Sequence, residues 1–245
     1  MYIGVQGSAF GFRWNQQQRF KARSYSIDLL GLTCEMADYC IIRAMKLLSN
    51  SEIMALHKKY ATNQKDFDSI WGHCQIVWEI AQRCAENTDQ EVDMDVLRNV
   101  CLLHDIGAYP FMHQRKGGGK DKWLYPLHSL LGSAILWGEK NEKIPEVVYD
   151  SVRTHNLMGL TKEEIEANDF PMGYHDQTPM SVEGLILCYA DRYHSKDPHF
   201  NNPDTMLKFW HKRYPRQVEI FKKAQKEFGT PDLEALSKKF GQPIK

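Results

Sequence analysis

Apolar residues recur at spacings of three and four in five separate segments of the chain, a pattern typical of helices with one buried face. In the first segment Ile70, Val77, Ile80 and Cys84 form such a stripe, and His73 lies on it. The other four segments also carry a His or Asp in phase with their apolar residues: Leu97, Val100 and His104; His128, Leu131 and Ile135; Val148, Val152 and His155; Gly184, Leu187 and Asp191. The pattern predicts helices that each direct one polar side chain into a shared interior.

Helix-start signals support the same fold class. Ser49 with Glu52, and Thr161 with Glu164, have the spacing of capping boxes. Three prolines stand where a first-turn proline would begin a helix: Pro126, Pro145 and Pro179. Alternating strand patterns are nearly absent. We therefore predict an all-α helical bundle with a metal site in its interior.

The chain divides into three predicted parts. Residues 1–48 form an N-terminal extension, in which "SYSIDLLGLTCEMADYCIIRA" (24–44) has the character of one helix. Met45 also resembles a natural beginning, which makes residues 1–44 either an extension or an over-long start. Residues 49–195 form the helical domain. Residues 196–245 form a C-terminal helical extension, with a polar turn region, a charged helix interrupted at Pro215 and a short final helix.

Length, charge and cysteine usage narrow the function classes. A chain of 245 residues can bury a sizeable core. The chain has 31 Lys and Arg residues and 31 Asp and Glu residues, so its formal net charge is zero. The net charge therefore indicates no nucleic-acid or membrane partner. Four of the six cysteines lie in apolar helical segments, without CxxC spacing, where they act as small hydrophobes. With no membrane span and no signal peptide visible, we expect a cytoplasmic protein.

Six polar residues fall at interior positions of the predicted helices: His73, His104, Asp105, His128, His155 and Asp191. One such histidine is more often a hydrogen-bonded core residue, but burying the carboxylates without a cation would cost several kcal/mol each. The set exceeds the three protein ligands of a catalytic zinc. It suits two divalent ions bridged by Asp105, with Fe, Mn, Co, Ni or Zn as candidates. A single ion held by His73, His104, Asp105 and Asp191 is the alternative.

The segment "VCLLHDIGAYP" (100–110) explains how two of these ligands come together. An apolar helix is predicted to end there, so that its last turn delivers His104 and Asp105 side by side. Gly107 follows directly, and we expect it to turn the chain away from the ions.

The order H…HD…H…H…D, with "HDIG" at 104–107, resembles the HD-domain metal-dependent phosphohydrolase superfamily. The flanking segments "HSLLGSAIL" (128–136), "THNLMGLTKEE" (154–164) and "EGLILCYADRY" (183–193) are similar to small HDIG-type proteins, including bacterial dinucleoside-tetraphosphate hydrolases. The similarity covers roughly residues 50–195. It implies an all-α fold, divalent metal and hydrolysis of a phosphate ester or anhydride.

Catalytic groups follow from this chemistry. Two ions about 3.5–4 Å apart can acidify a bridging water, so we expect a metal-bound hydroxide as the nucleophile, with Asp105 at its centre. Lys116, in the basic glycine-rich loop "HQRKGGGKDKW", and Arg153 are the predicted phosphate contacts. Arg192 is a further candidate, and a solvated loop is the alternative for residues 113–122. We expect the remaining histidines of the loops and helix ends to lie on the surface, with His113 the one best placed to touch substrate: His113, His175, His194 and His199.

Three functions compete for this ligand set. The first is a phosphohydrolase acting on a nucleotide or another small phosphorylated substrate. The second is a mixed-valent di-iron oxygenase of the same fold, similar to myo-inositol oxygenase, which metal identity and dioxygen consumption would distinguish. The third is a non-catalytic HD domain that senses a ligand. The complete ligand set favours an enzyme, and the resemblance favours the hydrolase.

Overall fold

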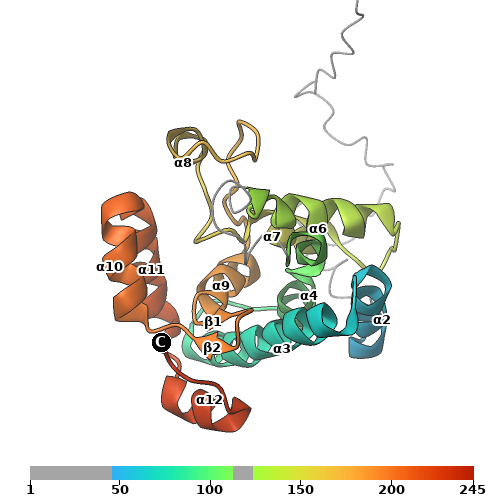
Figure 1. Cartoon of the computed structure of the whole chain (residues 1–245), viewed down its shortest axis with the longest axis horizontal. Coiled ribbons are helices and arrows are strands. Elements are labelled where there is room, and N and C mark those ends of the chain that lie inside the picture. Colours follow the sequence, from blue (N-terminus) through green and yellow to red (C-terminus); the bar gives the residue numbers. More distant parts are fainter. Residues whose placement is uncertain (1–45, 113–123) are drawn as a thin grey trace, which may run out of the picture. The chain divides into compact units, whose positions relative to one another are not determined.

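A computed structural model describes residues 46–112 and 124–245, and the regular elements of these parts are helices apart from two very short strands (Figure 1). The helix predicted within residues 24–44 and the loop at 113–122 lie outside the described residues. The elements are α2 (Asn50–Tyr60), α3 (Gln64–Asn87), α4 (Met94–Leu103), the 3-10 helix η1 (Ile106–Phe111), α6 (Leu127–Gly138), α7 (Glu146–Thr154), α8 (Lys162–Ala167), α9 (Val182–Asp191), β1 (His194–Ser195), β2 (His199–Phe200), α10 (Pro203–Arg213), α11 (Pro215–Phe228) and α12 (Leu233–Phe240). The predicted all-α fold is confirmed.

The long helix α3 lies at the centre of the core and packs against α4 and α9. Its predicted stripe is buried from Ile70 to Cys84, including His73. The stripes of α4, α7 and α9 are buried as predicted too. Full burial of each Ile, Val or Leu side chain contributes roughly 1.5–3 kcal/mol, so the apolar positions fix which face of each helix points inward. The polar residues on the same face are therefore buried as well.

Helix α6 meets η1 through two glycines. A Cβ atom on Gly107 would lie 2.2 Å from the carbonyl oxygen of His128 and 2.3 Å from the nitrogen of Gly132. The backbone at Gly107 has no left-handed conformation. Our expectation that Gly107 turns the chain away was therefore wrong, because the residue instead allows two backbones to touch. The same contact makes Gly132, Leu136 and His128 the buried face of α6, whereas Leu131 and Ile135 are only partly buried.

The predicted helix starts are mostly correct. Ser49 and Thr161 each form both bonds of a capping box, which confirms these two predictions. Helices α6 and α7 begin one residue after Pro126 and Pro145, which occupy the cap position. Pro179 stands further back, since Ser181 caps α9 and accepts a hydrogen bond from the Gly184 nitrogen.

The C-terminal part belongs to the same compact unit, which spans Ile42–Lys245. Helices α10 and α11 pack together, and α11 also contacts α3 and α9 (Figure 1). Pro215 begins α11, at the predicted interruption. The predicted polar turn region holds the antiparallel pair of β1 and β2, in which His194 lies opposite Phe200.

Two further expectations concern the cysteines and membrane-spanning helices. Cys74, Cys84, Cys101 and Cys188 are buried free thiols, as predicted. None of the helices in residues 46–112 and 124–245 combines the length and the apolar character needed to span a membrane.

Candidate metal centre

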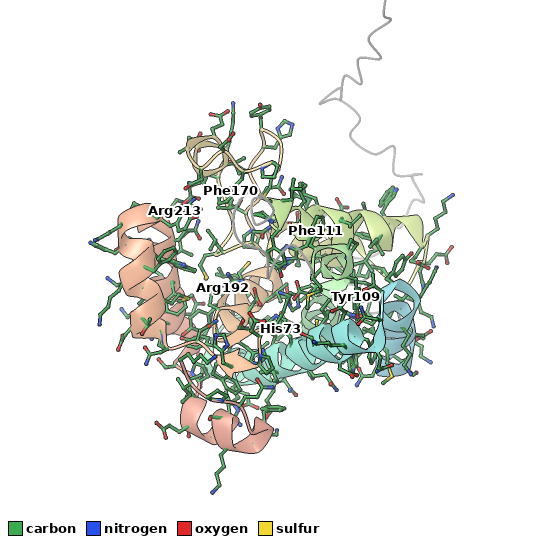
Figure 2. All side chains as sticks on the ribbon, in the orientation of Figure 1. His73, Tyr109, Phe111, Phe170, Arg192 and Arg213 are labelled. Atoms are coloured by element: carbon green, nitrogen blue, oxygen red, sulfur yellow. The ribbon has the colours of Figure 1, made fainter. Side chains whose placement is uncertain are left out.

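The helices of the bundle bring six polar side chains into one buried cluster: His73, His104, Asp105, His128, His155 and Asp191. His73 comes from the middle of α3, and Figure 2 labels it there. His104 and Asp105 follow the last turn of α4, as predicted, and His128 lies in the first turn of α6. The remaining two, His155 and Asp191, lie at the C-terminal ends of α7 and α9.

The carboxylate of Asp105 divides this cluster into two halves. Its Oδ2 atom lies 3.3 Å from Nε2 of His73 and 3.2 Å from Nε2 of His104. Its Oδ1 atom lies 3.3 Å from Nε2 of His128 and 3.6 Å from Nε2 of His155. Each half offers three ligand atoms within 4.8 Å of one another. Asp105 is therefore the residue that both halves share.

Asp191 adds a second carboxylate to one half only. Its Oδ1 atom lies 2.9 Å from Nε2 of His73 and 3.6 Å from Nε2 of His104. The half that contains His73 and His104 is therefore the more acidic of the two.

The backbone sets the tautomer of three histidines. The Nδ1 atoms of His104, His128 and His155 lie 2.8, 2.6 and 2.7 Å from the carbonyl oxygen three residues earlier. A carbonyl only accepts a hydrogen bond, so each Nδ1 must donate its proton. In the neutral ring the Nε2 atom then carries a lone pair, which faces Asp105. This is the form in which imidazole binds a metal.

Burial keeps most of these rings neutral. It lowers the pKa of His155 to about 3 and also lowers the pKa values of His73 and His128. At His104 burial likewise disfavours the charged form, but the adjacent Asp105 carboxylate outweighs it and raises the pKa. Burial opposes ionisation of Asp105, yet His104 and Lys196 hold its pKa well below the usual range.

The donor set fits a divalent metal. As neutral rings, His128 and His155 place acceptor against acceptor, with their Nε2 atoms 2.9 Å apart, and Nε2 of His73 lies 3.2 Å from Nε2 of His104. Within the described parts of the chain, neither oxygen of the fully buried Asp105 accepts a hydrogen bond of good geometry. Cations between these atoms would satisfy them together, and imidazole with carboxylate suits Fe, Mn, Co, Ni or Zn.

A family model shows where this cluster belongs. The HD domain model matches residues 70–196, which is half of the chain and contains all six residues of the cluster. The chain belongs to the HD domain family. The family is one of metal-dependent phosphohydrolase type, and in this HD domain His104 and Asp105 form the adjacent pair. No curated protein and no solved structure matches the chain.

Two cationic side chains lie against the cluster of the HD domain. Lys196, between β1 and β2, forms an ion pair with Asp105, and its Nζ atom lies 5.6 Å from the ring centroid of Tyr125. Arg192 forms an ion pair with Asp191, and its Nε atom is buried without a hydrogen bond among the described residues. Burial lowers the pKa of Lys196, but the charge of Asp105 outweighs it, so the pKa is raised and the ammonium stays charged.

A cavity of about 660 Å³ opens onto this HD domain cluster. His128, His155 and Asp191 line it at the cluster, together with Arg192 and Lys196. The rest of the lining has an aromatic and apolar part and a polar part. The first comprises Tyr125, Pro126, Leu157, Leu160, Phe170, Met206, Phe209, Trp210 and Tyr214, and the second Asn156, His194, Ser195, His199, Asn201, Asn202, Thr205 and Lys245. Figure 2 labels two of the lining residues, Phe170 and Arg192. The cavity therefore combines charged side chains at the cluster with a mixed aromatic, apolar and polar lining.

Some predicted site residues lie elsewhere. Arg153 donates hydrogen bonds of 2.6 Å to Asp150 and to Gln177, and it does not line the cavity. Its catalytic role stays a prediction without geometric support. Lys116 and His113 lie outside the described residues, so their roles stay predictions as well.

The surface prediction was wrong for one histidine. His175 is exposed as expected, but His194 is buried, and its Nδ1 atom lies 2.8 Å from Nδ1 of His73. His199 is half-buried and lines the cavity. The sequence reasoning also missed Lys196, which it placed in a polar turn. Its only signal was the position five residues after Asp191.

Proposed function

We propose that this HD-domain protein is a metal-dependent phosphohydrolase that acts on a nucleotide or another small phosphate ester or anhydride. One observation carries the proposal: the buried Asp105 carboxylate presents each of its oxygens to a separate pair of histidine Nε2 atoms. A carboxylate shared in this way is suited to two divalent cations. His73, His104 and Asp191 would hold one of them, and His128 and His155 the other.

Bound divalent cations would supply Lewis acidity toward water and phosphoryl oxygens. The chain itself supplies the rest of the electrostatics. Arg192 and Lys196 border the cavity next to the cluster and would bind phosphoryl oxygens, where a guanidinium forms directional paired hydrogen bonds and an ammonium acts as a point charge. Their partners Asp191 and Asp105 hold them in place before substrate arrives.

The aromatic and apolar part of the cavity wall would contact the part of the substrate that carries the phosphate. Phe170 and Tyr214 stack with ring centroids 6.5 Å apart, and Tyr125 stacks on His128 at 4.5 Å. Such rings exclude water from the reacting phosphate, which strengthens each charge interaction there.

The test is metal analysis of protein purified without chelator, followed by a panel of phosphate esters and nucleotides. We expect about two ions per chain and phosphate release that does not consume dioxygen. Phosphate release from none of the compounds, combined with dioxygen consumption by an iron-loaded protein, would support the oxygenase instead. A metal-free protein that binds a nucleotide without turnover would support the sensor.

Two matched substitutions test the assignment of the cationic groups. Lys196→Met removes a charge from the cavity, and we expect kcat/KM to fall by roughly ten- to a hundredfold, about 1.4–2.8 kcal/mol, with metal content unchanged. Arg153→Gln removes a charge of the same sign outside the cavity and should leave kcat/KM within about twofold. If Arg153→Gln lowered kcat/KM more than Lys196→Met, Arg153 would be the phosphate contact instead.

A further inference from the structure

His73 is oriented differently from the other three histidines of the cluster. Its Nδ1 atom contacts no backbone carbonyl in the described structure but lies 2.8 Å from Nδ1 of His194. The two rings are stacked at a centroid distance of 5.1 Å. On its other side, Nε2 of His194 lies 2.7 Å from Oε1 of Gln242. Three side chains therefore form a chain of contacts that ends at the cluster.

The hydrogen positions along this chain follow from its outer end. The amide oxygen of Gln242 only accepts, so Nε2 of His194 must donate. In the neutral ring Nδ1 of His194 is then an acceptor, and Nδ1 of His73 donates to it. That leaves a lone pair on Nε2 of His73, which faces Asp105 and Asp191. The direction of the chain thus gives His73 the tautomer that the backbone gives to the other three.

Gln242 is held by the segment that follows α12. Its backbone nitrogen donates to Ser237 at 3.1 Å, and its carbonyl accepts from the Ser237 hydroxyl at 2.5 Å. The next residues pair with β2, since Phe200 donates to the carbonyl of Pro243 and Lys245 donates to the carbonyl of Phe200, both at 2.9 Å. These bonds fix the backbone at Gln242, which lies 46 residues beyond the end of the family match, and its side chain reaches His194 from there.

We propose that His194 and Gln242 are positioning residues that hold His73 in its metal-binding tautomer, so that the C-terminal segment sets the affinity of one ion. The inference rests on the proposed two-metal site. It also predicts something that the proposed function does not: only the metal affinity of the half with His73 should depend on residues outside the family match. Partners of this kind typically change metal affinity 10- to 100-fold when removed.

Two pairs of variants separate hydrogen bonding from packing. Gln242→Leu removes the acceptor, and Gln242→Glu retains it. His194→Phe keeps an aromatic ring without an acceptor, and His194→Asn places an amide oxygen near the position of Nδ1. We expect the Leu and Phe variants to weaken one of the two Co²⁺ ions by 10- to 100-fold in a chelator competition. The Glu and Asn variants should stay within about threefold of wild type.

A spectroscopic measurement tests the tautomer itself. In the Zn²⁺-loaded full chain, the ring ¹⁵N shifts of His194 should show a proton on Nε2 and none on Nδ1. In Gln242→Leu this preference should weaken, while the shifts of His128 and His155 should not change. Thermal unfolding of each variant reports any general loss of stability, which would weaken both ions equally.

The outcomes separate this inference from the function on which it rests. Loss of one ion in the Leu and Phe variants, with rescue by Glu and Asn, supports it. Wild-type affinity for both ions in all four variants overturns it and leaves the two-metal hydrolase standing. Equal weakening of both ions also overturns it, since His73 belongs to one half. A wild-type chain that binds no Co²⁺ overturns the proposed function and this inference together.

Discussion

Two buried histidines, His57 and His73, differ in what their ring nitrogens contact. Both are almost fully buried in the same core. His57 donates from Nε2 to the carbonyl of Leu102 at 2.7 Å and accepts from the Tyr109 hydroxyl at Nδ1 at 2.8 Å. Nδ1 of His73 lies 2.8 Å from Nδ1 of His194, but its Nε2 atom faces two carboxylates and a second imidazole. The two rings are equally buried, but their nitrogen atoms have different partners.

The comparison separates a structural histidine from a candidate ligand. A ring with a donor partner on one nitrogen and an acceptor partner on the other is satisfied as it stands. A ring whose Nε2 lone pair faces carboxylate oxygens and a second imidazole, as at His73, is placed to bind a cation. The variants below test whether the two kinds of site respond as differently as their contacts predict.

The largest effect is expected for Asp105→Asn, which keeps the size of the shared side chain and removes its charge. Because both halves of the cluster use Asp105, we expect loss of both ions and of nearly all activity, with the helical content preserved. Metal analysis and circular dichroism check this. Wild-type metal content in the variant would refute Asp105 as the shared ligand.

The next effect concerns one half of the cluster. His155→Ala should lower the metal content from about two ions to one per chain, because only the Oδ1 half loses a ligand. His104→Ala should remove the other ion. If a metal-soaked crystal holds one ion, bound by His73, His104, Asp105 and Asp191, the single-ion alternative is correct.

His57→Leu should affect stability and leave metal alone. The change strands the Tyr109 hydroxyl and the Leu102 carbonyl in the core, and we expect the free energy of unfolding to fall by about 2–4 kcal/mol. Denaturant unfolding measures the loss, and metal analysis is the control. A reduced metal content in a folded His57→Leu protein would break the distinction between the two histidines.

The smallest effect is a pH dependence that belongs to His57. Burial lowers its pKa from 6.5 to about 4, so between these values the unfolded chain binds a proton that the folded chain does not. Stability should therefore fall as the pH falls, by about 1.6 kcal/mol between pH 6.5 and pH 5. Unfolding curves of wild type and His57→Leu at both pH values isolate this contribution, because the variant should lack it.

Periodicity predicted most of the fold and the residues of the cluster, because those residues lie on regular helices or directly after their last turn. The phase of Ile70, Val77 and Ile80 placed His73 inside, and the end of an apolar run placed His104 and Asp105 together. The cluster's assembly follows from burying those faces.

The residues that periodicity missed lie where no repeat exists. His194 and Lys196 belong to a two-strand turn, and their partners are 121 and 91 residues away in the chain. Gln242 contacts His194, and the last segment of the chain, which pairs with β2, holds it there. Gly107 was assigned the wrong role, because a glycine that admits a neighbouring backbone and one that turns a chain look alike in sequence.

The contact between Gly107 and Gly132 bears on how firmly the centre keeps its dimensions. A spacing determined by side chains changes whenever a rotamer changes, but one determined by two touching backbones changes only when whole elements move. Asp105 lies two residues before this contact, and His128 lies four residues before Gly132. The span across the shared carboxylate is thus set by the main chain. Substitutions in the surrounding core can repack without altering that span, whereas one methyl group at residue 107 would force it open.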